Sequence, residues 1–174
     1  KGFFTDPYKV FDNRPRTRNS ATLLARWNHH LDATGGTLRS SYRWFGDTYG
    51  IQAHTLGFEY VQPLPGGWSL MPLVRLYTQS KARFYVEANA DPDYPFPPNP
   101  PDDAVHYSED QRVSAFGAHT WGLKLARQIG NDWLVDLKFE QYGQRASWRL
   151  FGSGSPRLAA FDARSWQLGI TRQF

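Results

Sequence analysis

Residues 163–174 alternate between apolar and polar side chains almost to the last residue of the sequence. Trp166, Leu168, Ile170 and Phe174 fall on one face of an extended strand, because every second side chain points the same way. In water such a strand edge is prone to aggregation, whereas in an outer membrane the apolar face meets lipid and the edge pairs with a first strand. The segment predicts the closing strand of a membrane barrel, with the last strand of a soluble β-sandwich as the alternative.

Six further segments show the same division into an apolar and a polar face. They cover residues 21–31, 37–44, 51–62, 68–79, 111–128 and 133–144. Pro72 lies inside one of them and cannot donate to a strand ladder, so we expect a local break there. Val113 and Ala115 are assigned to the apolar face of the segment that contains them.

The connections between the segments differ in length in the way an outer-membrane barrel requires. Short turns are expected at residues 32–36, 63–67 and 129–132, and long connections at 80–109 and 147–161, with a short exception at 46–50. In such barrels the turns on the periplasmic side are short and the extracellular loops are long. Counting back from a periplasmic Phe174 places the long connections, and residues 1–19, outside the cell.

The whole chain is predicted to be one all-β domain, an antiparallel transmembrane β-barrel of outer-membrane type. Residues 1–19 form an extracellular segment, 20–80 four strands, 81–109 a Pro-rich extracellular loop and 110–174 three strands. Bacterial single-chain barrels have an even number of strands. Seven strands therefore indicate the C-terminal part of a longer protein that builds a larger barrel, or alternatively a dimer of two such halves.

Composition agrees with a barrel that has a wet interior. Aromatic residues make up 16% of the chain, yet the mean hydropathy is −0.60. No run approaches the roughly 18 apolar residues of a transmembrane helix. Trp68 and Trp133 are assigned to an inner aromatic girdle and Trp44 and Trp166 to an outer one. The net charge of +4 comes from arginines spread along the strands, without a nucleic-acid-binding motif, so no nucleic-acid partner is expected.

Charged side chains on the polar face form the main candidate site, with two open interpretations. One is a charged constriction that selects anionic solutes, and the other is a network of ion pairs that fills a closed lumen. The lumen-facing candidates are Arg26, Arg39, Arg43, Arg75, Lys138 and Arg164, opposed by Glu59, Asp136 and Glu140.

Other candidate sites are weaker. Phe3, Phe4, Tyr8 and Arg14 are predicted to form an extracellular surface, against which the loop 81–109 packs as a cap over the barrel mouth. The five histidines are too dispersed for a metal or haem site, so no metal and no cofactor are expected. Six acidic residues around the Pro-rich loop match no calcium-binding spacing. Ser153, Ser155 and His106 lack the pattern of a hydrolase.

Five short segments carry a resemblance to a known family: residues 4–9, 12–15, 42–43, 54–55 and 75–85. They are similar to an uncharacterised family of Gram-negative outer-membrane β-barrel proteins, classed as a domain of unknown function. The resemblance covers most of the chain and implies a barrel fold, an outer-membrane location and family members that are longer at the N-terminus. It implies no activity. Arg172 departs from the aromatic-rich ending typical of such barrels, at a depth where arginine can snorkel to water.

The prediction is an integral, porin-like, non-enzymatic outer-membrane barrel of a Gram-negative bacterium that acts as a channel or a scaffold. The alternative is a sheath around a partner protein in an outer-membrane complex, for instance in electron transfer, and a hydrolase is more remote. Expected partners are outer-membrane lipid, other subunits of such a complex, and the barrel assembly machinery through Phe174.

Overall fold

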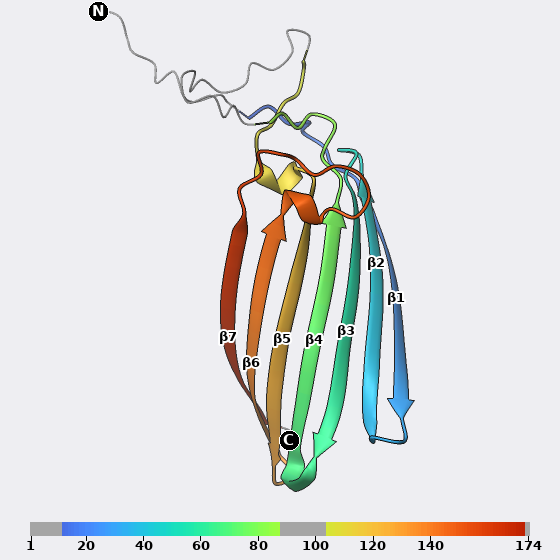
Figure 1. Ribbon diagram of the computed structural model, residues 1–174, viewed down its shortest axis with the longest axis vertical. Coiled ribbons are helices and arrows are strands. Elements are labelled where there is room, and N and C mark those ends of the chain that lie inside the picture. The colour runs from blue at the N-terminus through green and yellow to red at the C-terminus, as the bar shows by residue number, and fades with distance from the viewer. Residues whose placement is uncertain (1–11, 88–103, 173–174) are drawn as a thin grey trace, which may run out of the picture.

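The computed structural model describes residues 12–87 and 104–172, and its strands form one antiparallel sheet in chain order (Figure 1). The seven strands are β1 (Ser20–Leu31), β2 (Gly36–Asp47), β3 (Gln52–Leu64), β4 (Trp68–Gln79), β5 (Phe116–Ile129), β6 (Trp133–Arg145) and β7 (Phe161–Arg172). Three short 3-10 turns accompany them: η1 (Pro65–Gly67), η2 (Gln111–Val113) and η3 (Ala146–Trp148). The predicted all-β class and the seven antiparallel strands are confirmed.

The sheet is open, and its seven strands do not close into a barrel by themselves. Within the described residues β1 pairs with β2 and β7 pairs with β6, and no pairing joins β1 to β7. Both outer strands therefore keep a row of backbone groups without a strand partner there. No helix in the described part of the chain has the length and apolarity needed to span a bilayer.

The strand register agrees with the alternation in the sequence. Leu38 lies opposite Tyr60, and Leu137 lies opposite Leu168, so apolar residues meet apolar residues across each ladder. Pro72 interrupts only one of its two ladders. The pairing of β3 with β4 skips Tyr60 and Val61, while Pro72 remains opposite Leu123 of β5. The expected local break is therefore confined to the β3 side.

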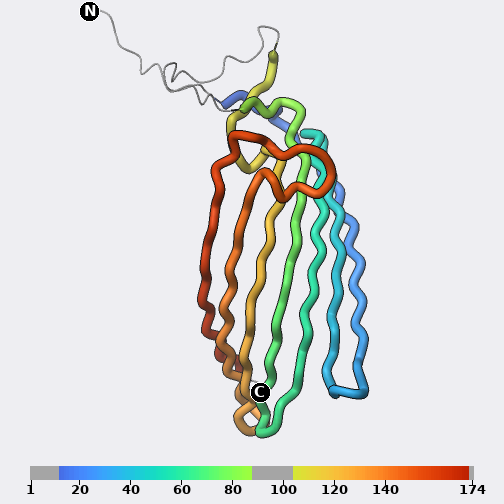
Figure 2. The backbone as a smooth tube through the Cα atoms, in the orientation of Figure 1, coloured from blue at the N-terminus to red at the C-terminus, as the bar shows by residue number. Residues whose placement is uncertain are grey.

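The two faces of the sheet differ in side-chain size as well as polarity. On β5 the apolar face carries Trp121, Leu123 and Leu125, whereas the polar face carries Ala118, Thr120, Gly122 and Ala126. Because the side chains of the polar face are small, the sheet can curve toward that face. The bulky side chains of the apolar face then lie on the outer side of the curve. Figures 1 and 2 show the resulting curved sheet. The polar face is the concave one and the apolar face the convex one.

The two ends of the sheet are unlike each other (Figure 2). At one end the strands are joined by short turns, where Gly35 and Gly130 adopt φ of 64° and 60°. Glycine takes this left-handed conformation without the steric cost that a side chain would bring. At the other end the long segments 80–115 and 146–160 connect β4 to β5 and β6 to β7. This arrangement of short and long connections confirms the sequence-based prediction.

Most deeply buried apolar side chains lie at the long-connection end. They belong either to a layer we call the cap (residues 12–19, 48–51, 80–87, 104–115 and 146–160) or to the strand ends next to it. One cluster joins Tyr49, Ile51, Ala82, Tyr85 and Val113. A second joins Leu158 to Phe116 and Ala118 on the polar face of β5. Val113 and Ala115 belong to this layer, with 3% and 1% exposure. Their assignment to an apolar strand face is wrong, because η2 ends the loop before β5 begins.

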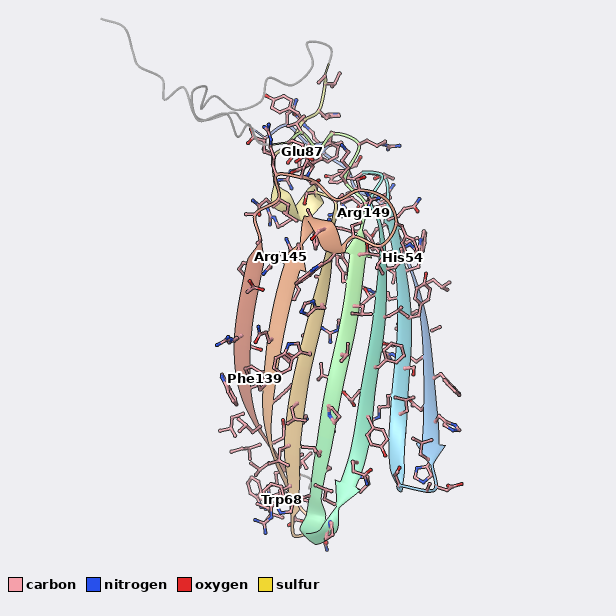
Figure 3. All side chains as sticks on the ribbon, viewed as in Figure 1. His54, Trp68, Glu87, Phe139, Arg145 and Arg149 are labelled. Atoms are coloured by element: carbon pink, nitrogen blue, oxygen red, sulfur yellow. The ribbon has the colours of Figure 1, made fainter. Side chains whose placement is uncertain are left out.

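Three of the four tryptophans assigned to aromatic girdles lie near strand ends, as expected, and Trp166 does not. Trp44 lies near the Asp47 end of β2, at the long-connection end. Trp68 and Trp133 lie near the short turns, where each ring stacks under a guanidinium, that of Arg127 at 5.0 Å and that of Arg172 at 5.3 Å. Trp166 instead lies midway along β7, packed on Phe139 with ring centroids 4.7 Å apart. Figure 3 shows Trp68 at the turn end and Phe139 between the two ends. Phe174 lies outside the described residues.

Candidate binding groove on the polar face

Most of the charged candidates identified in the sequence lie together on the concave polar face. Arg39 lies opposite Glu59, Arg75 lies opposite Gly57, and Glu140 lies opposite Gly122, so these positions share one side of the sheet. The same register places Arg26, Arg43, Asp136 and Lys138 there. Arg164 is the exception. It lies opposite Gln141, in the face that carries Trp166, and its assignment to the polar face is wrong.

Three ion pairs connect neighbouring positions of this face. Arg39 Nη1 lies 2.9 Å from Glu59 Oε1, Lys124 Nζ lies 3.2 Å from Asp136 Oδ1, and Lys138 Nζ lies 2.9 Å from Glu140 Oε1. Lys124 is not among the candidates predicted from the sequence. It lies two residues after Gly122 and therefore on the same polar face. Two of the three pairs lie on β5 and β6. On this half of the sheet the lysines are paired with acidic residues.

The other half of the sheet carries cations without partners. Arg26 on β1, Arg43 on β2 and Arg75 on β4 make no ion pair or hydrogen bond with any of the described residues. The two lysine pairs lie on β5 and β6, whereas β1 to β4 carry the three unpaired arginines together with the Arg39–Glu59 pair. The ion-pair network is therefore incomplete on strands β1 to β4.

A groove of about 470 Å³ lies on the side of the unpaired arginines. Its cationic lining residues are Arg26, Arg39, Arg75 and Lys138, and its acidic one is Glu59. Lys138 comes from β6, on the far side of β5, so the curvature of the sheet brings it toward residues of β1 to β4. The volume lies in the range of about 300–1,000 Å³ that small-molecule sites occupy.

Two small residues form the floor between the arginines. Ser41 lies opposite Arg26 and opposite Gly57, and Gly57 lies opposite Arg75. A Cβ atom at Gly57 would come within 2.7 Å of Ser41 Oγ. The absence of a side chain at Gly57 therefore keeps the floor low between Arg26 and Arg75.

Glu140 has an unusual environment beside this groove. Its Oε1 atom is buried and makes no hydrogen bond within the described structure, although the ammonium of Lys138 lies 2.9 Å away. The distance is that of an ion pair. We regard the contact as electrostatic, and it compensates the burial of the carboxylate only in part.

A second set of charges joins segments of the cap to one another. Arg14 contacts both Asp12 and Asp110, and its Nη2 lies 2.7 Å from Asp110 Oδ2. Arg112 donates to the same carboxylate from its side chain at 2.8 Å and from its backbone. These hydrogen bonds, first from Arg112 and then from Arg14, hold the pKa of Asp110 well below its usual range, although partial burial opposes them.

The remainder of the cap is fixed by neutral and mixed contacts. Arg18 donates twice to the buried carboxylate of Asp47, at 2.8 and 2.6 Å, and lies 4.8 Å from the ring centre of Tyr49. Burial, with the nearby charge of Glu87, raises the pKa of Tyr85 to about 12. Of the predicted extracellular surface, Arg14 is therefore part of the cap, whereas Phe3, Phe4 and Tyr8 lie outside the described residues.

The weaker candidates are not brought together. His54 lies on the apolar face, where its Nδ1 is 2.7 Å from Tyr42 Oη. Ser155 is buried and accepts a hydrogen bond from the backbone of Ala115, and no hydrogen bond links His106 to Ser153 or Ser155 within the described chain. Among the described residues no group of acidic, histidine or cysteine side chains could hold a metal ion. Of the acidic set, Asp91, Asp93, Asp102 and Asp103 lie outside these residues.

The sequence did not reveal one element, the strap of residues 146–151 that crosses the apolar face. Trp148 packs on His119 with ring centroids 4.4 Å apart, and Phe151 packs on His54 at 5.2 Å. Leu150 N donates to Thr78 Oγ1. Gly117 and Gly143 lie under the strap and give it room. Two glycines on the same face of neighbouring strands, two register positions apart, are the signal that could have predicted it.

Comparison with known proteins gives a family and no activity. A family model described as protein of unknown function, DUF3570, matches residues 2–165, which is nearly the whole chain. No curated protein and no solved structure matches. The function has to be argued from the two faces of the sheet.

Proposed function

The chain belongs to the DUF3570 family of proteins of unknown function, and we propose that it is an integral protein of a Gram-negative outer membrane. In this proposal its seven strands form part of a β-barrel, the convex apolar face meets lipid, and the concave polar face lines the lumen. The barrel acts as a channel for small solutes, without enzymatic activity.

The observation that carries the proposal is the exposure of the apolar face. Trp121, Leu123 and Leu137 on inner strands are 43–46% exposed, and Trp27 and Leu168 on the outer strands reach 63% and 71%. A soluble monomer rarely exposes a continuous apolar patch larger than a few hundred Å². This face extends over seven strands of 12–14 residues, an area on the order of 1,000 Å² at normal strand spacing. Lipid is the environment that stabilises such a surface.

The strand lengths support a membrane location. A strand of 12 residues extends about 40 Å, and a barrel tilt of about 40° reduces this to roughly 30 Å along the membrane normal. That is the thickness of the hydrocarbon core. The short turns and the cap then fall at opposite membrane surfaces, with the cations over Trp68 and Trp133 at the turn side.

The unpaired edges of β1 and β7 require further strands in a bilayer, because hydrocarbon offers backbone groups no hydrogen-bond partner. We propose that these strands come from another part of a longer chain, with a second copy of this sheet as the alternative source. A barrel made by two copies gives a defined dimer by native mass spectrometry of the full-length protein. A barrel made by one longer chain gives a monomer.

A sheath around a partner protein is the second candidate function. Its supporting observation is the open concave face, where the groove between β1 and β4 offers a surface lined by charges. The two functions predict different behaviour in planar bilayers. A steady conductance from the purified full-length protein supports the channel, and a silent protein that co-purifies with a stoichiometric partner supports the sheath. A protein that stays monodisperse in buffer without detergent overturns both.

A further inference from the structure

The unpaired arginines of the polar face call for a counterion. We propose that the groove binds a small multivalent oxyanion, of the class of phosphate esters and di- or tricarboxylates, between Arg26 and Arg75. The inference rests on the proposed function for its physiological meaning, since the groove lies in the proposed lumen. The binding itself depends only on the described geometry.

The groove carries a net positive charge. Four cations and one carboxylate line the groove, which gives it a net charge of +3. Including Glu140, the partner of Lys138, still leaves +2. Like charges gathered in a concave surface with a low-dielectric wall raise the local potential and attract anions. Since protein partners neutralise only Arg39 and Lys138, the charges of Arg26 and Arg75 remain for a ligand.

The placement of the two arginines also fits an anion between them. They are three strand spacings apart, about 14 Å between backbones, and both line the same groove. Nothing taller than Ser41 stands between them, because Gly57 has no side chain. Guanidinium groups donate in a planar fork that matches carboxylate and phosphate oxygens. Two guanidinium groups with the hydroxyl of Ser41 between them fit an anion with several oxygen atoms better than they fit chloride.

The lysines of this face and the two arginines of the groove differ in their neighbours. On β5 and β6 the lysines 124 and 138 each have an acidic neighbour. If the arginines served only to fill and rigidify the lumen, acidic residues would be expected beside them too. The positions next to Arg26 and Arg75 hold Ser41 and Gly57 instead.

The test is calorimetric titration of the full-length protein in detergent micelles with sodium phosphate and with citrate at constant ionic strength. We expect saturable binding of at least one of them, weakened about tenfold or more by Arg26→Gln and by Arg75→Gln, since each removes a charge-assisted contact. The control is Arg164→Gln, which removes the same charge from the apolar face. Its affinity should stay within about twofold of the unchanged protein. Comparing the ligands shows whether tetrahedral or carboxylate oxygens are preferred.

A second variant keeps the test valid if an arginine substitution disturbs folding. Ser41→Asp places a carboxylate on the floor, in space that Gly57 leaves open, and should abolish anion binding while the sheet forms normally by circular dichroism. Undetectable binding of both anions by the unchanged protein overturns the inference, as does equal weakening by Arg164→Gln. Binding without conductance retains the anion site and rejects the channel, whereas conductance without binding does the reverse.

Discussion

Asn13 and Tyr107 exchange two backbone hydrogen bonds, Asn13 N to Tyr107 O at 3.0 Å and Tyr107 N to Asn13 O at 2.9 Å. This short bridge joins the segment that precedes β1 to the connection between β4 and β5. The side chain of Asn13 adds a contact to Val105 O at 2.7 Å. The predicted packing of the Pro-rich loop against the N-terminal segment is thus present where both segments are described. The bridge ties two cap segments together beside the Arg14–Asp110 ion pair.

Asp110→Asn should loosen this bridge. The substitution removes the charge that receives hydrogen bonds from Arg14 and Arg112, and it should lower the local opening free energy of the cap by about 1–2 kcal/mol. Hydrogen exchange of the Asn13 and Tyr107 amides measures this as about tenfold lower protection. Amides in the middle of β5 serve as the internal control and should not change.

The same carboxylate makes the cap sensitive to acid. The pKa of Asp110 is lowered in the folded cap relative to an ordinary value of about 3.9. Its stabilisation is therefore complete above about pH 5 and is lost as the pH falls below about 4 toward the lowered pKa. Burial raises the pKa of Glu109, which works in the opposite direction, since its stabilisation is gained on protonation. Hydrogen-exchange protection of the Asn13 and Tyr107 amides should fall in acid. An equal fall in the Asp110→Asn variant would show that the acid sensitivity does not come from Asp110.

Gly117→Ala should displace the strap of residues 146–151. A Cβ atom at this position would overlap Trp148 O, a backbone atom that no side-chain rotation can move away. We expect a loss of about 1–3 kcal/mol in the free energy of unfolding, typical of overpacking. Near-ultraviolet circular dichroism should also lose intensity as Trp148 leaves His119. Gly57→Ala is the matched control, because its Cβ atom meets only the hydroxyl of Ser41. Equal destabilisation by both variants would reject the special role of Gly117.

Glu59→Gln should tighten anion binding in the groove. Glu59 is the acidic residue of the lining, and its loss frees Arg39 for a ligand. An increase in citrate or phosphate affinity of about threefold to tenfold is expected from one additional unopposed charge near the site. Asp162→Asn on β7 removes a carboxylate of an exposed pair with Arg145 and should leave the affinity unchanged. A weaker affinity in Glu59→Gln would show that Arg39 needs its partner for correct orientation.

The faces of the sheet could be predicted from sequence because the period of two is local information. Leu137 and Lys138 are adjacent, and extended backbone alone sends them to opposite sides. The strand ends followed equally from glycines such as Gly35 and Gly130. The errors arose where tertiary contacts outweigh the pattern. Val113 continues the alternation of β5 but is taken into the cap by η2, whose N-terminus is held by Asp110.

The residues of the candidate site could be predicted from the sequence, but the ion pairs between them could not. The alternation placed Arg26, Arg39 and Arg75 on one face, yet only the register decides which of them meets an acid. Arg39 lies opposite Glu59, while Arg75 lies opposite Gly57. Register depends on turn geometry and on the whole ladder, which single segments do not encode. Curvature, which brings Lys138 to the groove, depends in turn on small residues spread over several strands.

Val74→Glu and Leu73→Glu test the assignment of the two faces at adjacent positions of β4. Val74 lies on the apolar face opposite Phe58 and Trp121, and Leu73 lies on the polar face opposite Glu59 and Gly122. A carboxylate at position 74 would enter hydrocarbon and should reduce the stability of the protein in lipid vesicles by about 2 kcal/mol, somewhat less than a basic residue would. At position 73 the same carboxylate enters the cationic groove between Arg39 and Arg75 and should be tolerated, at the expense of anion binding. The measurement is urea unfolding in vesicles followed by tryptophan fluorescence. If Val74→Glu leaves stability unchanged while Leu73→Glu reduces it, the convex face does not meet lipid.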